Sequence, residues 1–263
     1  MLPNESESTV TLAALQQMKR DRKKIAGVVV WDYQMAQIAD RAGVDIISVG
    51  DSVGVNLWGH ASENEITLDE MAIVCKAVRR GVKRALVNCD LPSGIAKQGA
   101  DAVLRAATRL VKECGADTIK LDDAANFPET VFALKRAGIQ VFAEFHGDPK
   151  AMDQTQAFVQ QAQLLESAGA ALLNFRHSGP FAGPEVVRAV TIPVIGGLGG
   201  GPWLDGRMRM ANAAIGYAAS NLESKTENYA NVAKIAFDAI SAYAQDVRAG
   251  RQLKGTAPAK PAA

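Results

Sequence analysis

A short unit recurs along the chain: a helical stretch ends in a small residue and a glycine, and an apolar run follows. It occurs at residues 42–47, 114–119, 137–142 and 168–173, and more loosely at 80–87. The glycine suits the left-handed conformation that ends many helices, and the apolar run suits a strand buried on both faces. This alternation of helices and buried strands predicts a parallel sheet covered by helices.

The number of units favours a closed barrel. Further strands are expected at residues 26–31 and 192–195, and an eighth within 208–217. Seven or eight units in 263 residues fit a (β/α)8 (TIM) barrel. An open doubly wound sheet is the alternative, but the glycine fingerprint of dinucleotide-binding sheets is absent after the first strand.

Two helices are expected outside the repeats, an N-terminal one from Thr9 or Thr11 to about Arg20 and a long amphipathic one over 226–248. A capping box, Thr67-Leu68-Asp69-Glu70, should open another that ends near Arg80. The remaining helices are expected at 98–113, 127–137, 151–168 and 183–190. We predict one barrel domain over residues 9–250, with a disordered N-terminus (1–8) and a disordered tail (251–263).

Composition narrows the function classes. The net charge is +1, and no basic tract is interleaved with aromatic residues, so neither nucleic acid nor a membrane surface is expected as a partner. The N-terminus is acidic and polar, unlike a signal peptide, and no apolar run could span a bilayer. Cys75, Cys89 and Cys114 show no Cys-x-x-Cys spacing and are expected to be buried and reduced in a cytoplasmic protein.

One predicted strand, residues 44–49, leads into the sequence Val-Gly-Asp-Ser-Val-Gly at 49–54. Asp51 supplies a hard oxygen ligand and Ser52 a hydroxyl, while the flanking glycines let the backbone bend or approach a ligand closely. Such a turn could simply be solvated. Its place at the carboxyl end of a strand, where α/β enzymes keep their chemistry, favours a site.

Later strands end in similar groups, with Asp90 after the third strand and Asp122 after the fourth. Because all strands of a barrel end at one mouth, these carboxylates and Asp51 should lie near each other. Three carboxylates fit a hard divalent cation, Mg²⁺ more than Zn²⁺.

Lys120 precedes Asp122 by two residues, so both side chains should point to the barrel interior or mouth. A lysine there is costly unless it is paired or bound to a ligand. It could form a purely structural ion pair with Asp122. It could also bind a ligand carboxylate or a developing enolate as a point charge.

The remaining strand ends offer further candidates, two of which are histidines that could face the mouth or turn away. A glycine-rich run after the seventh strand could cradle an anion or form a flexible loop. His60 is expected to pack within a polar loop. The candidates are Glu144 and His146 after the fifth strand, Asn174, Arg176 and His177 after the sixth, and the run Gly196–Gly201.

Taken together, these motifs resemble the ketopantoate (3-methyl-2-oxobutanoate) hydroxymethyltransferase family. The likeness runs from about residue 9 to 206 and is dense up to Leu121. The stretches that carry it are 42–54, Trp58-Gly-His60, 66–71, 79–87, Asp90-Leu-Pro-Ser-Gly94, 115–121 and 192–196.

The resemblance implies a (β/α)8 barrel of the phosphoenolpyruvate mutase/isocitrate lyase superfamily and a homo-oligomer. It implies transfer of a hydroxymethyl group from 5,10-methylenetetrahydrofolate to 2-oxoisovalerate, a step of pantothenate biosynthesis. Asp51, Asp90 and Asp122 would hold Mg²⁺, with Asp122 in place of a longer family glutamate. Ser52 and Lys120 would bind the oxo acid's carboxylate end, with Asp51 and Asp90 beside them. The metal would stabilise an enolate.

The departures from the family concern proton transfer. Arg176 stands where the family has its general base, a glutamate, and the segment 143–146 stands where the family has a Gly-His-Leu-Gly stretch. Arginine cannot act as the base. Either Glu144 or a histidine has therefore taken over as the base, or the chemistry differs. We take Glu144, Lys120 and Arg176 as the catalytic candidates, with the hypothesis that Glu144 is the base after an exchange of charges between two strand ends.

Three functions follow. The first is hydroxymethyl transfer from 5,10-methylenetetrahydrofolate, or formaldehyde, to a 2-oxo acid. The second is a carbon–carbon lyase or hydrolase acting on a 2-oxo acid, in which Arg176 would bind a second carboxylate. The third is a non-catalytic homologue that binds a metabolite or serves as a structural subunit.

Overall fold

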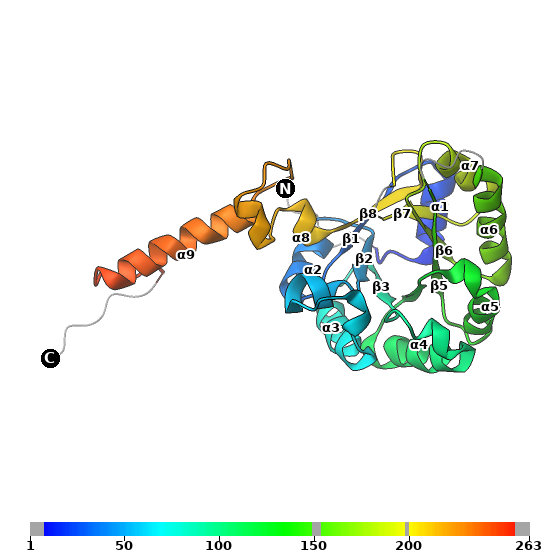
Figure 1. Cartoon of the computed structure of the whole chain (residues 1–263), viewed down its shortest axis with the longest axis horizontal. Coiled ribbons are helices and arrows are strands. Elements are labelled where there is room, and N and C mark those ends of the chain that lie inside the picture. The colour runs from blue at the N-terminus through cyan, green and yellow to red at the C-terminus, as the bar shows by residue number, and fades with distance from the viewer. Residues whose placement is uncertain (1–7, 149–153, 198–199, 256–263) are drawn as a thin grey trace. The chain divides into compact units, whose positions relative to one another are not determined.

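Eight parallel strands close into a barrel in the computed structural model, which describes residues 8–148, 154–197 and 200–255. Neighbours along the chain are neighbours in the barrel, and β8 pairs with β1 (Figure 1). This confirms the predicted (β/α)8 barrel. The strands are β1 Ile25–Val29, β2 Ile46–Val49, β3 Leu86–Asp90, β4 Thr118–Leu121, β5 Val141–His146, β6 Leu172–Arg176, β7 Val194–Gly196 and β8 Gly206–Met210.

Helices follow the strands and surround the barrel, as Figure 1 shows for α2 to α7. The α-helices are α1 Leu12–Arg20, α2 Tyr33–Arg41, α3 Leu68–Gly81, α4 Ala100–Cys114, α5 Pro128–Arg136, α6 Thr155–Ala168, α7 Ala182–Ala189, α8 Ala211–Ala214 and α9 Val232–Arg248. Shorter helices are η1 Gly54–Trp58, η2 Glu63–Glu65, η3 Ala96–Gln98, η4 Ala124–Asn126 and η6 Ala219–Leu222.

Local sequence signals explain several helix boundaries. The glycines of the four close repeats have positive φ, between 78° and 101°, which confirms their helix-ending role. Thr11 caps α1 through its side chain, and Thr67 and Glu70 form the predicted capping box of α3. Gly81, in the looser copy, instead belongs to α3, where a Cβ would come within 2.7 Å of the Tyr33 carbonyl oxygen.

The C-terminal elements differ from the expected boundaries. The eighth strand begins at Gly206, two residues before the window in which it was expected, and ends at Met210. The long helix begins at Val232 and not at 226, because the Asn231 side chain caps it by accepting from the Lys234 amide. Residues 251–255 form no helix or strand. The disorder predicted for 1–7 and 256–263, and the helix start predicted at 151–153, lie outside the described residues.

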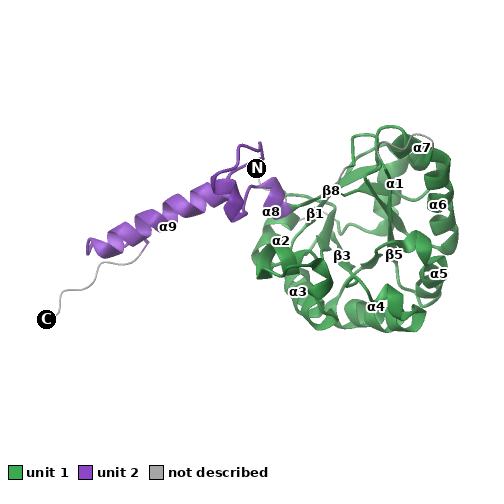
Figure 2. Ribbon diagram, viewed as in Figure 1, with its two compact units in different colours: residues 1–210 green, residues 211–263 purple. Residues whose placement is uncertain are grey.

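The chain divides into two compact units, residues 1–210 and residues 211–263 (Figure 2). The first contains the whole barrel, and the second contains α8, η6 and α9. A single domain over 9–250 stays a prediction.

An apolar core fills the end of the barrel at which the strands begin. Residues from seven strands pack there with Leu15 of α1, which is fully buried. These strand residues lie near the amino ends of their strands, so α1 closes that end of the barrel. The opposite end, where the strands finish, remains for a functional site. The strand members are Ile25, Ile46, Leu86, Phe142, Leu172, Ile195 and Met208.

A buried carboxylate organises the entry to β3. Asp40 of α2 accepts hydrogen bonds from the backbone amides of Lys83, Arg84 and Ala85, at 2.7–3.1 Å for the shortest contact to each.

We expect Asp40→Ala to lower the free energy of unfolding by about 3 kcal/mol, because three amides lose a charged acceptor. Urea unfolding measures this. Asp238→Ala, in an exposed pair with Lys234, should change stability by less than about 0.5 kcal/mol, and equal effects would contradict the assignment.

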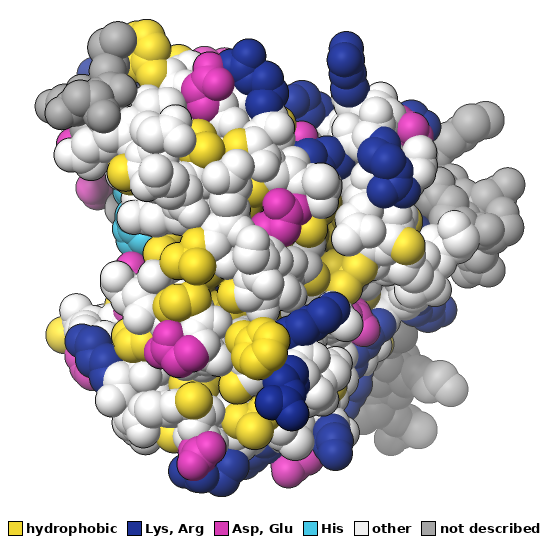
Figure 3. Space-filling model, turned by 90° about the vertical axis from the view of Figure 1, so that its right-hand side faces the viewer, with side chains coloured by type: hydrophobic (Ala, Val, Ile, Leu, Met, Phe, Trp, Pro, Cys, Tyr) yellow, Lys and Arg dark blue, Asp and Glu magenta, His cyan; other side chains and the backbone are white. Residues whose placement is uncertain are grey.

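The face of the molecule seen in Figure 3 carries both positive and negative side chains. Lysine and arginine side chains alternate there with aspartate and glutamate, and hydrophobic side chains are scattered between them. Within the described residues, no helix is both long enough and apolar enough to cross a membrane.

Candidate active site

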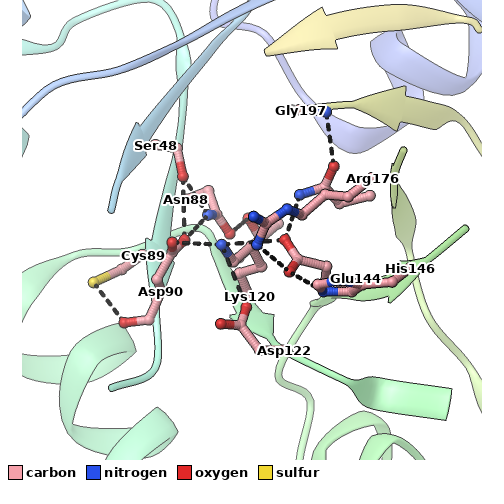
Figure 4. A network of polar contacts seen from close by, with 12 residues as sticks. Ser48, Asn88, Cys89, Asp90, Lys120, Asp122, Glu144, His146, Arg176 and Gly197 are labelled. Carbon is pink, nitrogen blue, oxygen red and sulfur yellow. Dashed lines mark hydrogen bonds and ion pairs between the residues drawn. The ribbon is translucent and has the colours of Figure 1, made fainter. Parts of the chain in front are cut away.

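The carboxyl ends of β3, β4, β5 and β6 bring a network of charged side chains together. Asp90 ends β3, Lys120 lies one residue before the end of β4, and Arg176 ends β6. Asp90 pairs in register with Lys120, and His146 with Arg176, so their side chains emerge at matching heights. Figure 4 shows the Lys120 ammonium between Asp90 on one side and Glu144 on the other.

Lys120 contacts three carboxylates. Its Nζ lies 2.6 Å from Asp90 Oδ2, 3.3 Å from Asp122 Oδ1 and 3.4 Å from Glu144 Oε2. The structural ion pair with Asp122 considered from the sequence therefore exists, but as one of three contacts. A lysine shared in this way is fixed in position, which a point charge for an anionic ligand requires.

Glu144 is surrounded by donors and is 1% exposed. Its Oε2 accepts from Asn174 Nδ2 at 2.7 Å, and its Oε1 lies 3.1 Å from both Arg176 Nη1 and His146 Nε2. The side chains at the ends of β5 and β6 thus meet directly. They form an ion pair across β5 and β6, while the exchange of charges relative to the family stays a prediction.

A layer of uncharged polar residues beneath the network holds Asp90. Asn88 Nδ2 donates to Asp90 Oδ1 at 3.0 Å, Ser48 Oγ donates to the same atom at 3.3 Å, and Thr118 Oγ1 donates to Asn88 Oδ1 at 2.9 Å. Sequence reasoning missed Ser48, Asn88 and Thr118. Their signal was spacing, because Asn88 precedes Asp90 by two and Thr118 precedes Lys120 by two, and alternate strand residues share a face.

Asp51 follows β2 and reaches the network through its charge. It is 6% exposed and interacts electrostatically with Asp90, Lys120 and Asp122. Gly50 is required by close packing, since a Cβ there would lie 2.7 Å from Val29 Cγ1. In the part of the chain that the structure describes, the Ser52 hydroxyl makes no hydrogen bond to another side chain.

Three carboxyl groups have raised pKa values. Burial and, next, the charge of Asp90 raise the pKa of Asp51 to about 8. Burial raises the pKa of Asp90 to about 6 although Lys120 opposes it. Burial also raises the pKa of Asp122, against the attraction of Lys120. The shifts arise first from burial, with repulsion between neighbouring carboxylates adding to it and Lys120 opposing it.

The other titrating groups shift with their ion pairs. Burial disfavours the Glu144 carboxylate, yet Lys120, His146 and Arg176 outweigh it and lower its pKa to about 2. Burial likewise opposes the charged Lys120, but the surrounding carboxylates hold its pKa well above the usual range. The hydrogen bond to Glu144 raises the pKa of His146.

The carboxylates of Asp51, Asp90 and Asp122 fit a hard cation, because such cations prefer carboxylate oxygens as ligands. Asp122 Oδ1 is buried and accepts no hydrogen bond, although it lies in the ion pair with Lys120. Across the described ranges, no three histidine, cysteine, aspartate or glutamate side chains form a preassembled metal cage. The metal site of Asp51, Asp90 and Asp122 stays a prediction.

The remaining candidate residues differ in whether they contact the network. His146 joins the network. His177 has a positive φ of 51°, and no hydrogen bond or ion pair of its side chain is found among the described residues. His60 packs against Gly54, where a Cβ would lie 2.7 Å from His60 Nδ1. In the glycine-rich run, the Gly197 amide donates to Asn174 Oδ1 at 3.0 Å, and residues 198–199 lie outside the described part.

Solved structures share this fold. The 2,3-dimethylmalate lyase, described as a PEP mutase/isocitrate lyase superfamily member, aligns with a TM-score of 0.62 at 14% identity, covering 96% of this chain and 93% of that one. Phosphoenolpyruvate phosphomutase from Streptomyces platensis subsp. rosaceus aligns with a TM-score of 0.62 at 14% identity, covering 94% and 92%. At these identities the likeness concerns the fold.

Sequence relatives are closer. The 3-methyl-2-oxobutanoate hydroxymethyltransferase of a Cyanothece species is 34% identical over 255 residues, covering 91% of this chain and 96% of the relative. That of Gloeobacter violaceus is 32% identical over 254 residues, covering 91% and 97%. The sequence model described as ketopantoate hydroxymethyltransferase matches residues 9–252. The chain therefore belongs to the ketopantoate hydroxymethyltransferase family.

Proposed function

We propose that this protein transfers a hydroxymethyl group to a 2-oxo acid such as 2-oxoisovalerate (3-methyl-2-oxobutanoate). The donor is 5,10-methylenetetrahydrofolate, or formaldehyde in its place, and the product belongs to pantothenate biosynthesis. Family membership supports the reaction class. The observation that carries the proposal is the buried ammonium of Lys120 at the barrel mouth, which would bind an anionic acceptor once a divalent cation offsets the carboxylates around it.

Asp51, Asp90 and Asp122 would hold Mg²⁺. Their raised pKa values support this, because a divalent cation would supply the positive charge that the buried carboxylates lack. When bound, the metal would polarise the keto group and so acidify the neighbouring carbon. Ser52 and Lys120 would bind the carboxylate end of the oxo acid, beside Asp51 and Asp90.

Glu144 is our candidate for the base that removes the proton from that carbon. A carboxylate with a pKa of about 2 is a poor base at neutral pH. For Glu144 to accept a proton, its pKa must rise when the ligand binds. This requires the negative charge of the ligand to pair with Lys120 or Arg176 and so to weaken their ion pairs with Glu144. Arg176 is suited to this exchange because its side chain is 31% exposed at the mouth.

The reaction can be tested directly. The protein is incubated with Mg²⁺ and 2-oxoisovalerate in D₂O, and then with 5,10-methylenetetrahydrofolate or formaldehyde. Deuterium uptake at the carbon next to the keto group and formation of the hydroxymethyl product are the expected results. Uptake without product would show a different donor or acceptor, and absence of both would overturn the proposal.

Glu144→Gln is expected to slow deuterium exchange by about 10²-fold or more, because general base catalysis contributes about 10²–10⁴. Mg²⁺ binding should survive, which calorimetry measures. Asp123→Asn is a suitable control, since among the described residues the Asp123 side chain meets the network at one point, 3.7 Å from His146 Nε2. Full exchange in Glu144→Gln would assign the base to another group.

A lyase or hydrolase acting on a 2-oxo acid is the second candidate. The observation that favours it is the Arg176 guanidinium at the mouth, which could bind a second carboxylate bidentately. Cleavage of a branched 2-oxo dicarboxylate, followed by detection of the released 2-oxo acid, would distinguish it from hydroxymethyl transfer. Neither turnover nor exchange, with ligand binding retained, would leave a metabolite-binding homologue.

We further expect a cytoplasmic homo-oligomer. Residues of α9 expose an apolar face, with Ile235 64%, Ile240 66% and Tyr243 58% exposed, as helices at subunit contacts do. The three cysteines are free and buried, as expected for reduced thiols.

A further inference from the structure

A cavity outside the network around Lys120 lies next to the β3–α4 connection. Its volume is ≈ 550 Å³. One wall is the segment leading into α3, and the other is the β3–α4 connection with the first turns of α4. The polar lining comes from Asn64, Thr67, Ser93, Gln98, Arg105 and Arg109, and apolar residues fill the space between them.

The cavity contains a cation, Arg105, that forms no ion pair within the described residues. Arg109 is engaged, since its guanidinium lies 2.5 Å from Asp69 Oδ1 and 3.6 Å from Glu113 Oε2. Arg105, one turn earlier on α4, is exposed, and no carboxylate in the described part of the chain pairs with it. The N-terminus of α4 also lies at this cavity, and Gly99 offers no side chain to cap it. Both features favour an anion.

The cavity adjoins the candidate active site along the chain. Pro92 and Ser93 line it and follow Asp90 by two and three residues, so the Cα of Pro92 lies within about 7 Å of that of Asp90. Ser93 Oγ donates to Asn64 Oδ1 at 2.6 Å, which ties the two walls together. A long ligand could therefore place one end at the mouth and the other in this cavity.

We propose that the cavity binds the p-aminobenzoyl-glutamate part of the one-carbon donor, with Arg105 bound to a glutamate carboxylate. The inference rests on the proposed function, because only a folate donor brings this group. Its chemistry matches the cavity: the aromatic ring packs on the apolar lining around Pro92 and Ile95, and the carboxylates meet the arginine side. Formaldehyde, which lacks the group, does not use the cavity.

The test compares donors. For Arg105→Ala, the ratio of kcat/KM with 5,10-methylenetetrahydrofolate to kcat/KM with formaldehyde should fall about tenfold, mostly through KM for the folate. Arg105→Lys should recover part of the loss. Arg80→Ala, which removes an exposed arginine of α3 outside the cavity, should leave the ratio unchanged. An unchanged ratio in Arg105→Ala would overturn the inference.

A binding measurement separates this inference from the proposed reaction. Calorimetry with 5-formyltetrahydrofolate, and with a tetrahydropterin lacking the p-aminobenzoyl-glutamate part, needs no turnover. Binding that requires that part and weakens about tenfold in Arg105→Ala supports the cavity assignment even if the transfer assay fails. Equal binding of the two probes, or of the folate by both proteins, contradicts it even if transfer succeeds.

Discussion

Lys120→Met is expected to lower kcat/KM by about 10³-fold, the scale of losing a preorganised charge at the point where negative charge develops. The side chain keeps most of its length, but the network loses the ammonium that contacts Asp90, Asp122 and Glu144. Steady-state kinetics with the 2-oxo acid measures the effect. A loss below tenfold would show that Lys120 serves the structure and not the ligand.

The same substitution should make stability strongly dependent on pH. Lys120 lowers the pKa values of Asp90, Asp122 and Glu144, so its removal raises all three in the folded state. Carboxyls whose folded pKa exceeds the unfolded value lose stability as the pH rises. We expect a destabilisation of about 3–5 kcal/mol at pH 8, the scale for breaking a buried ion pair, and less at pH 5.

A matched control is available on the surface. Lys234 forms an ion pair with Asp238 on α9, and both side chains are 56% exposed. Lys234→Met should change neither activity nor the pH dependence of unfolding, because exposed pairs contribute little. Equal pH profiles for Lys120→Met and the wild type would contradict the electrostatic account of the site.

Much of the barrel could be predicted because its signals are local. A glycine with positive φ ends α2, α4, α5 or α6, and an apolar run starts the next strand within a few residues. Such signals do not depend on distant parts of the chain. The eighth strand was harder to place because its sequence, Gly-Arg-Met-Arg-Met, alternates as a half-exposed strand does and is not an apolar run.

The position of the site could be predicted from the sequence, but not which of its side chains pair with each other. That Asp90, Lys120 and Asp122 share a mouth follows from strand polarity alone. That Lys120 also contacts Glu144, and that Glu144 pairs with Arg176, depends on the register of β4, β5 and β6, which sequence reasoning did not supply. The low pKa of Glu144 follows from these cross-strand contacts.

The contact between residues 144 and 176 explains how the end of β6 can carry a half-buried cation. Placed alone, Arg176 would bring an unpaired charge to a half-buried strand end, which is costly. With Glu144 on the neighbouring strand, the charge is neutralised at 3.1 Å. The two residues therefore depend on each other, and replacing either one alone by a neutral residue should be worse than replacing both together.

Without a divalent cation, the free energy of unfolding should fall as the pH rises from about 4 to about 8. Burial and Asp90 raise the pKa of Asp51 to about 8, and burial raises that of Asp90 to about 6. In this window the folded state holds protons that the unfolded state has released, so stability is lost as the pH rises. Glu144, with a pKa of about 2, acts oppositely but only below about pH 4.5.

Mg²⁺ should remove this loss by replacing the protons. At a concentration of about 100 Kd, a bound ligand contributes about 2.7 kcal/mol, which for a chain of this size raises Tm by roughly 5–10 °C. The rise should be largest at pH 8 and small at pH 5, because protons compete with the metal for Asp51 and Asp90. Thermal unfolding with and without Mg²⁺ at both pH values measures it.

Asp51→Asn tests the assignment. The variant cannot ionise at this position, so the fall in stability between pH 6 and pH 8 should flatten, and most of the Mg²⁺-dependent rise in Tm should disappear. Asp101→Asn, on the exposed first turn of α4, should keep the full rise. If Mg²⁺ stabilises Asp51→Asn as much as the wild type, the cation binds elsewhere, because removing one of three carboxylate donors weakens any site that uses it.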